Sequence, residues 1–346
     1  MSSGKLNDGW AAAHRLRRLS FVPAALLLLL AAHAATPPPS FGQAPGRRLI
    51  VTAAGARLRE RPETTAAETG RLQLGAVVDE LERSTEKSKV GAAEEFWHFV
   101  SAPGGARGWV FGALVSPFDP ARRDALYLKL AGERLANPTN AFADLTELVR
   151  FLDRATREVT RRDALAELEL ARLVALARSL AAIPLADLDK PPYKSWTDEH
   201  EKEIVYSDPA GQWFINSKVL WDLQRKYRDL PLAERIAWEA AQTPLPGECE
   251  GYLPCYIYNE SETNGRYLKL YPRGAHVGAS LSNLAESLGH IVEDLRGGNP
   301  VYEVPRADRP NFRRSVAALR AQLAAVPAAQ KARVTGQLDA IARRFR

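Results

Sequence analysis

Residues 96–100 read FWHFV and residues 106–111 read ARGWVF, and these two stretches decide the fold of the first part of the chain. Aromatic and β-branched side chains dominate both stretches, as is typical of strands. The run SAPGG at residues 101–105 lies between them, and its Pro and Gly residues indicate a turn. The two stretches therefore predict neighbouring strands joined by a short turn.

Further short strands are predicted on the N-terminal side of this pair, at residues 48–52, 56–62, 70–75 and 76–81. Turns that contain glycine separate them. This spacing of short strands favours a small β-barrel over residues 47–117. The charged residues 82–95 interrupt the pattern and are predicted to form a loop. The residues expected to fill the barrel are Leu58, Leu72, Leu74, Val78, Val100 and Val110.

Four motifs occur in order in this region: LRERP at residues 58–62, GRLQLG at 70–75, WHFV at 97–100 and GWVFGALV at 108–115. Together they resemble the motif series of the bacterial Src-homology-3 (SH3b-type) family, over about a fifth of the chain. The resemblance implies a small all-β barrel that binds a wall peptide or a protein and does no catalysis. The segment between Leu81 and Phe96 departs from the family, because it is longer and more charged.

The candidate ligand-binding residues of this module are Trp97, Trp109 and Phe111. A tryptophan in so small a barrel either fills the core or stays half-exposed. A half-exposed aromatic pair would form a groove for an extended peptide. The expected partner is therefore a peptide, a cell-wall polymer or another envelope protein.

The N-terminus has the three-part pattern of a secretory signal over residues 1–34. A basic segment precedes an apolar run at residues 21–32, and Ala32 and Ala34 are the small residues that a signal peptidase reads. The apolar run would span about 18 Å as a helix, which is short of the ~30 Å hydrocarbon core of a bilayer. We therefore expect an exported protein, periplasmic, extracellular or bound to the envelope, with membrane contact only through this segment if it is not removed.

A Pro- and Gly-rich linker follows the signal at residues 35–46. The net charge of the chain beyond the linker does not indicate that the protein binds nucleic acid. The chain has 47 Lys and Arg against 41 Asp and Glu, a net charge of +6, and half of this excess lies in residues 1–34. The sequence contains no phosphate-binding loop, dinucleotide fingerprint or nucleophile elbow, so we expect no cofactor and no nucleic-acid partner.

Residues 118–346 are predicted to form a mostly α-helical domain, which makes the chain a multidomain α+β protein. Apolar residues recur at the spacing of one helix face over residues 144–159 and 163–182. Residues 185–196 contain two adjacent prolines and are predicted to be a loop. Further helices are expected at residues 119–136, 218–227, 233–242, 262–271, 275–295, 311–326 and 328–345.

The stretch GRYLKLYPRGAH at residues 265–276 resembles the hinge between paired helices in some bacterial envelope tetratricopeptide-like proteins. In such a hinge, Tyr267, Leu268 and Tyr271 would pack inward. Pro272 would end the helix, Gly274 would turn the chain and the next helix would return antiparallel. The resemblance implies a scaffold of helical hairpins and nothing catalytic.

The two cysteines of the chain are Cys249 and Cys255. Export to an oxidising compartment favours a disulfide between them. A metal site would need further thiol or imidazole ligands nearby, and none is close in the sequence. His200 and Glu201 begin an HExxH-like stretch that lacks the second histidine, and the acidic residues around them, such as Glu203, are predicted to be solvated. No metal site is expected.

The sequence therefore favours a non-enzymatic binding or scaffold role in the cell envelope. The alternative is a glycosidase-like cell-wall hydrolase, in which Glu248 and Glu250 of the helical domain would divide the roles of acid and base. Glutamates are common on helix surfaces, and no spacing rule singles out these two carboxylates as catalytic.

Overall fold

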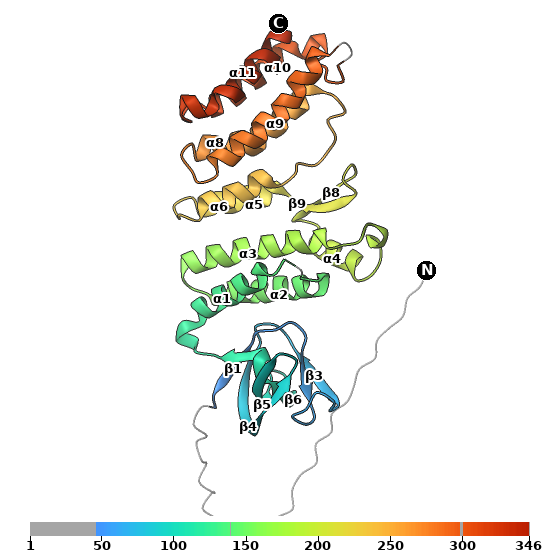
Figure 1. The fold of residues 1–346 in the computed structure, drawn as a ribbon, viewed down its shortest axis with the longest axis vertical. Helices are drawn as coiled ribbons and strands as arrows, with labels where there is room; N and C mark the ends of the chain where they lie inside the picture. The colour runs from blue at the N-terminus through green and yellow to red at the C-terminus, as the bar shows by residue number, and fades with distance from the viewer. Residues whose placement is uncertain (1–45, 139, 298–299, 346) are drawn as a thin grey trace, which may run out of the picture. The chain divides into compact units, whose positions relative to one another are not determined.

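A computed structural model of the protein describes residues 46–138, 140–297 and 300–345. The predicted signal at residues 1–34 and nearly all of the linker lie outside the described residues. Within them the fold is mixed α+β: a seven-stranded antiparallel sheet comes first and helices follow it (Figure 1).

The sheet has the strand order β3-β2-β6-β5-β4-β1-β7. It is curled, and β3 and β7 stand at its two edges. One face carries an apolar core that includes Leu58, Val100 and Val110, as expected. The strands are β1 (Arg48–Val51), β2 (Ala56–Arg59), β3 (Glu68–Leu72), β4 (Val77–Val90), β5 (Ala93–Ser101), β6 (Arg107–Phe111) and β7 (Val115–Pro117).

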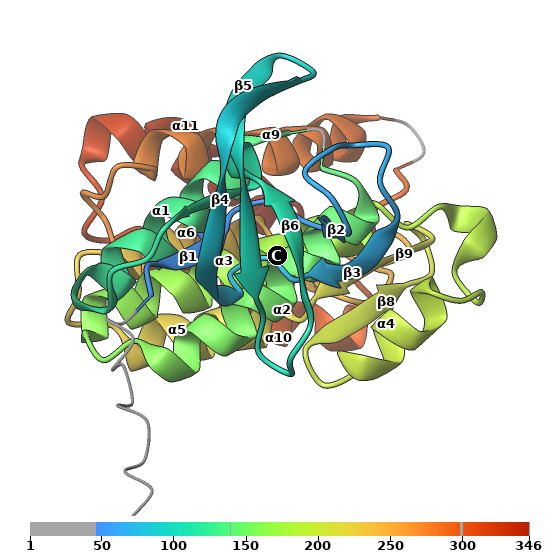
Figure 2. The same ribbon diagram turned by 90° about the horizontal axis from the view of Figure 1, so that it is seen from below.

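The loop predicted at residues 82–95 is wrong, because β4 and β5 continue through it as one long hairpin. Its turn lies at Gly91, and Figure 2 shows its end projecting from the sheet. Lys87 pairs with Phe96 in this distal part, where the two strands pair only with each other. A strand that does not pack on a hydrophobic core needs no apolar face. Its sequence can therefore be polar throughout, and such a sequence resembles a loop.

The helical part agrees closely with the predicted ranges, and successive helices pack on one another, as α2 does on α3 and α5 on α6. None of the described helices is long and apolar enough to cross a membrane. The longer helices are α1 (Arg123–Ala136), α2 (Phe142–Glu158), α3 (Arg162–Ala181), α5 (Ser217–Lys226), α6 (Ala233–Gln242), α9 (Val277–Arg296), α10 (Arg309–Gln322) and α11 (Ala328–Arg344).

Three further elements differ from the expectation. The loop predicted at residues 185–196 is partly wrong, because it runs into a short helix, α4 (Tyr193–Glu199). A hairpin of β8 (Ile204–Ser207) and β9 (Gln212–Ile215) was not predicted. The helix expected from residue 262 begins earlier, as α7 (Leu253–Glu260), and passes through a π-helical turn into α8 (Arg266–Leu270).

The hinge at residues 265–276 has the predicted mechanics. Tyr267 and Leu268 are fully buried, and α8 ends before Pro272. The Tyr267 hydroxyl donates to Glu234 of α6 over 2.8 Å and accepts from the backbone N–H of His276 over 3.0 Å. These bonds fix the turn between α8 and α9 onto α6.

The sheet and the helices meet where the turn before β4 rests on α2. The Glu147 carboxylate accepts from the backbone N–H of Leu74 over 2.6 Å, and Arg154 donates to the carbonyl of the same residue over 2.7 Å. Leu74, which was expected in the barrel core, instead belongs to the core of the helices. The next residue, Gly75, has a φ of 76°, and a Cβ built on it would lie 2.1 Å from the Phe151 ring.

We predict that Gly75→Ala destabilises the protein by about 2–4 kcal/mol, because the methyl group combines a left-handed backbone with an overlap against a buried ring. Gly104→Ala is the matched control, since its φ is 88° and nothing lies within 4 Å of a Cβ built there. The control should cost only about 1 kcal/mol. Chemical denaturation of both variants makes the comparison, and equal losses would show that Phe151 does not restrict this turn.

Candidate functional site

The predicted ligand-binding residues lie on one face of the β5–β6 pair. Side chains alternate across a strand, so residues 97 and 99 of β5 and residues 109 and 111 of β6 point away from the valine core. Trp97 pairs with Phe111, with ring centroids 5.3 Å apart, and Phe99 pairs with Trp109 at 5.4 Å. Phe99 was missed in the sequence, although its alternation with Trp97 was a usable signal.

A pocket of about 560 Å³ opens beside the first of these aromatic pairs. Trp97 and Phe111 line it and are only 3% and 5% exposed, whereas the half-buried Trp109 does not line it. The structure therefore brings two of the three predicted residues together in one cavity. The other lining residues are Ala54, Gly55, Ala56, Arg57, Arg59, Thr64, Val90, Ala92, Ala93, Ala113 and Leu114.

The pocket wall is mostly small and apolar, but it carries two arginines and no acidic residue. Arg57 is exposed and lies 3.4 Å from the carboxylate of Glu68. A hydrogen bond from Arg71 lowers the pKa of Glu68, so this carboxylate is ionised at neutral pH. Arg59 is half-buried and donates from Nη1 to the carbonyl of Ala66 over 2.8 Å. No carboxylate of the described residues lies within ion-pair distance of Arg59.

Trp97 also carries an unsatisfied donor. Its indole nitrogen is buried and has no hydrogen-bond partner among the described residues. A buried donor without an acceptor costs about 1–3 kcal/mol, and such groups are uncommon in folded proteins. This buried donor belongs to a residue that lines the pocket.

The rim of the pocket is held by the helical part of the chain. Gly55 lines the pocket, and its backbone N–H donates to the Glu147 carboxylate of α2 over 2.9 Å. The second oxygen of that carboxylate accepts from Leu74. One side chain thus fixes both the rim of the pocket and the turn before β4.

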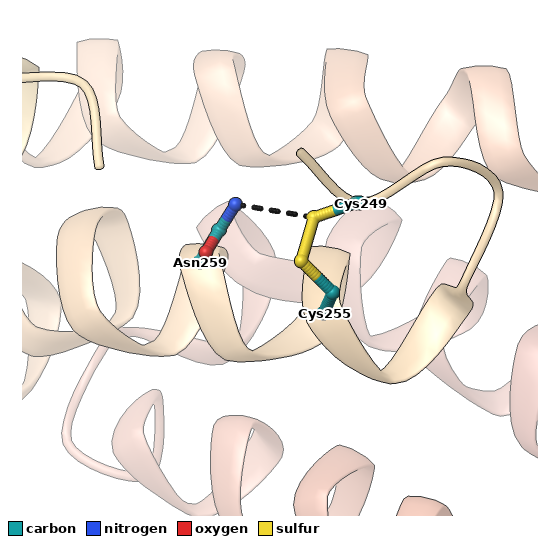
Figure 3. The surroundings of a disulfide bond; sticks show 3 residues. All are labelled: Cys249, Cys255 and Asn259. Carbon is teal, nitrogen blue, oxygen red and sulfur yellow. Dashed lines mark hydrogen bonds between the residues drawn. A yellow bond between two sulfur atoms is a disulfide. The ribbon is translucent and has the colours of Figure 1, made fainter. Parts of the chain in front are cut away.

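The residues of the hydrolase alternative lie elsewhere. Cys249 and Cys255 form a disulfide with their Cα atoms 5.4 Å apart, as predicted (Figure 3). Asn259 of α7 donates to the sulfur of Cys249 over 3.5 Å. Glu248 and Glu250 flank this cysteine on the loop; both are exposed, and neither lines the pocket described above.

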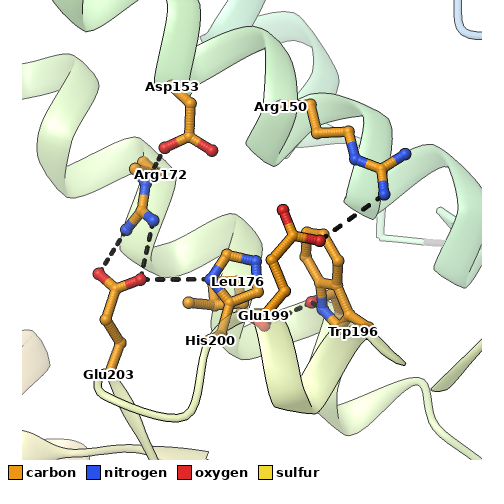
Figure 4. A network of polar contacts seen from close by, with 9 residues as sticks. Arg150, Asp153, Arg172, Leu176, Trp196, Glu199, His200 and Glu203 are labelled. Carbon is orange, nitrogen blue, oxygen red and sulfur yellow. Dashed lines mark hydrogen bonds and ion pairs between the residues drawn. The ribbon is translucent and has the colours of Figure 1, made fainter. Parts of the chain in front are cut away.

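A half-buried ionic network occupies the region of the HExxH-like stretch (Figure 4). The solvated setting predicted for Glu203 is wrong. Arg172 of α3 holds its carboxylate with two hydrogen bonds of 2.7 and 2.8 Å, and His200 contacts it over 3.2 Å. Burial alone would raise the pKa of Glu203, but the hydrogen bonds from His200 and Arg172 outweigh it and lower this pKa to about 2.

This network joins separate elements of the helical part. Arg172 also binds Asp153 of α2, and Trp196 of α4 donates from its indole to Ser179 of α3 over 2.9 Å. The network therefore fixes the β8–β9 hairpin and α4 against α2 and α3. Across the part of the chain that the structure describes, no group of His, Cys, Asp and Glu side chains could hold a metal ion.

The chain matches no protein-family model, and it has no significant match among curated proteins.

We predict that Glu203→Gln destabilises the protein by about 3 kcal/mol at neutral pH, because Arg172 and His200 lose their carboxylate. A lowered pKa stabilises the fold above the ordinary value of 4.5, and this stabilisation is lost as the pH falls toward 2. The difference between the two proteins should therefore shrink between pH 4.5 and 2 in denaturation measurements.

Glu199→Gln is the control for this experiment. Glu199 is exposed and lies 3.8 Å from Arg150, so its loss should change stability by less than about 1 kcal/mol at every pH. A pH-independent effect of Glu203→Gln would contradict the assignment of the low pKa to this carboxylate.

Proposed function

We propose that this protein is an exported binding or scaffold protein of the bacterial cell envelope. In this proposal residues 47–117 are an SH3b-type module that holds a peptide or a cell-wall component. The observation that carries the proposal is the apolar pocket floored by Trp97 and Phe111. Its size lies in the usual range for ligand sites, and a few polar groups among apolar walls are typical of such sites. The four ordered motifs of this region support the same interpretation.

Export is supported by two independent features. The disulfide between Cys249 and Cys255 is typical of proteins that leave the cytoplasm. The signal-like sequence at residues 1–34 also supports export. The helical part would then act as the scaffold that carries the module and presents its pocket.

The geometry favours binding over hydrolysis. A glycosidase needs one carboxyl group shielded from water, so that it stays protonated and acts as the acid, and a groove for the sugar. Glu248 and Glu250 are both exposed on the disulfide loop and provide no such pair of environments. The hydrolase therefore remains an outcome of the test below.

We predict that the purified protein sediments with insoluble bacterial cell wall and that Ala92→Trp abolishes this. Ala92 is exposed at the hairpin tip and lines the pocket, so a tryptophan there fills the cavity without entering a core. Glu94→Trp is the matched control, because this residue is exposed on the same hairpin and does not line the pocket.

The same wall preparation tests the alternative. No clearing of the wall is expected from the wild type. If the wild type clears the wall and Glu248→Gln or Glu250→Gln does not, the protein is a hydrolase and the binding proposal is wrong. Equal sedimentation of Ala92→Trp and Glu94→Trp would show that the pocket is not the wall-binding site.

We also predict that protein taken from its native compartment contains no titratable thiol, since both cysteines are paired. Thiol labelling in denaturant, followed by mass measurement, makes this test. Labelling after reduction serves as the positive control. Two reactive thiols in the unreduced sample would contradict export to an oxidising compartment.

A further inference from the structure

We propose that the pocket recognises the carboxylate of a short peptide and that the guanidinium of Arg59 anchors it. This inference rests on the proposed function, because it assumes that the pocket binds a peptide, and it adds the chemistry of the ligand. It follows from the charges of the lining residues, the free donors of Arg59 and the size of the side chains around it.

The pocket lacks an internal counter-ion for its positive charge. Arg57 and Arg59 are its charged lining residues, and no acidic side chain accompanies them in the described wall. Arg57 already faces Glu68. Arg59 is the half-buried member of the pair; its side-chain hydrogen bond goes to a backbone carbonyl, and Glu68, its cross-strand neighbour, interacts with it electrostatically without an ion-pair contact. A partly desolvated charge that no carboxylate contacts directly gains more from an incoming anion than an exposed charge does.

Arg59 also has the geometry to accept a carboxylate. A guanidinium presents several N–H donors in a flat fork, and one Nη1 bond to Ala66 leaves most of them free. Carboxylates fit such a fork with two parallel hydrogen bonds. The bond to Ala66 holds the arginine in place beforehand, so less side-chain entropy is lost when the ligand binds.

The surrounding wall selects small groups next to that carboxylate. Five alanines line the pocket, whereas its two large aromatic rings are nearly buried. This surface offers room and apolar contact for methyl-sized side chains. Thr64 adds a hydroxyl for a peptide amide. An alanine-rich peptide with a free C-terminal carboxylate meets all of these features.

The probe is acetyl-tetra-alanine with a free C-terminal carboxylate, compared with the same peptide as its C-terminal amide. Both are titrated into the full chain, and the indole N–H signal of Trp97 is followed by NMR. That signal is assigned from its loss in Trp97→Phe. Because Trp97 lines the pocket, its ring environment is expected to change when the pocket is occupied. The free acid is expected to bind at least about tenfold more tightly than the amide.

Arg59→Gln is expected to remove this preference, so that the acid binds no better than the amide. Arg59→Lys keeps the charge without the fork and should retain part of the preference. Arg61→Gln is the matched control: Arg61 is exposed, pairs with Glu63 and does not line the pocket, so the preference should persist.

The outcomes separate this inference from the proposed function. Equal binding of acid and amide would overturn the carboxylate anchor and leave a peptide-binding pocket. A preference that survives in Arg59→Gln would overturn the role of Arg59. Failure of both peptides to shift the Trp97 signal would overturn this inference. If wall sedimentation were still abolished by Ala92→Trp, the proposed function would stand with a ligand other than such a peptide.

Discussion

The contact between the turn before β4 and helix α2 is the constraint on which the rest of the structure depends. Leu74 enters the helical core, and its N–H and C=O are bound by Glu147 and Arg154. Gly75 leaves no space for a side chain between the backbone and Phe151. The strands and the helices consequently belong to one compact unit.

The β5–β6 pair serves two purposes because its two faces differ. Valines on one face fill the core of the sheet, and aromatic residues on the other face form the floor of the pocket. A strand can do both only because its side chains alternate. Packing of the valine face thus fixes the position of Trp97 and Phe111, which are themselves nearly buried and line the pocket.

The aromatic strands and most of the helices could be predicted, because their apolar residues recur with a clear period. The pairing of Cys249 with Cys255 could also be predicted, from the expected export of the chain. The hairpin over residues 82–95 could not, because its two strands pair only with each other and cover no core, so they need no apolar alternation. Two features of the sites were also hidden. In the sequence Glu203 resembles a surface charge, and only the fold shows that Arg172 of α3 lies beside it. Arg59 is part of a motif in the sequence, and only the fold shows that it lines the pocket. Both depend on contacts between residues distant in the sequence.

The double role of Glu147 has a mechanical consequence. If a tethered polymer pulls on whatever occupies the cavity, the strain at Gly55 passes through one hydrogen bond to the Glu147 carboxylate, which also holds Leu74, and on into α2. The load then spreads along a helix packed lengthwise against α3, which resists bending better than a flexible joint between modules. In the proposed envelope role, this arrangement would carry tension from the pocket into the helices.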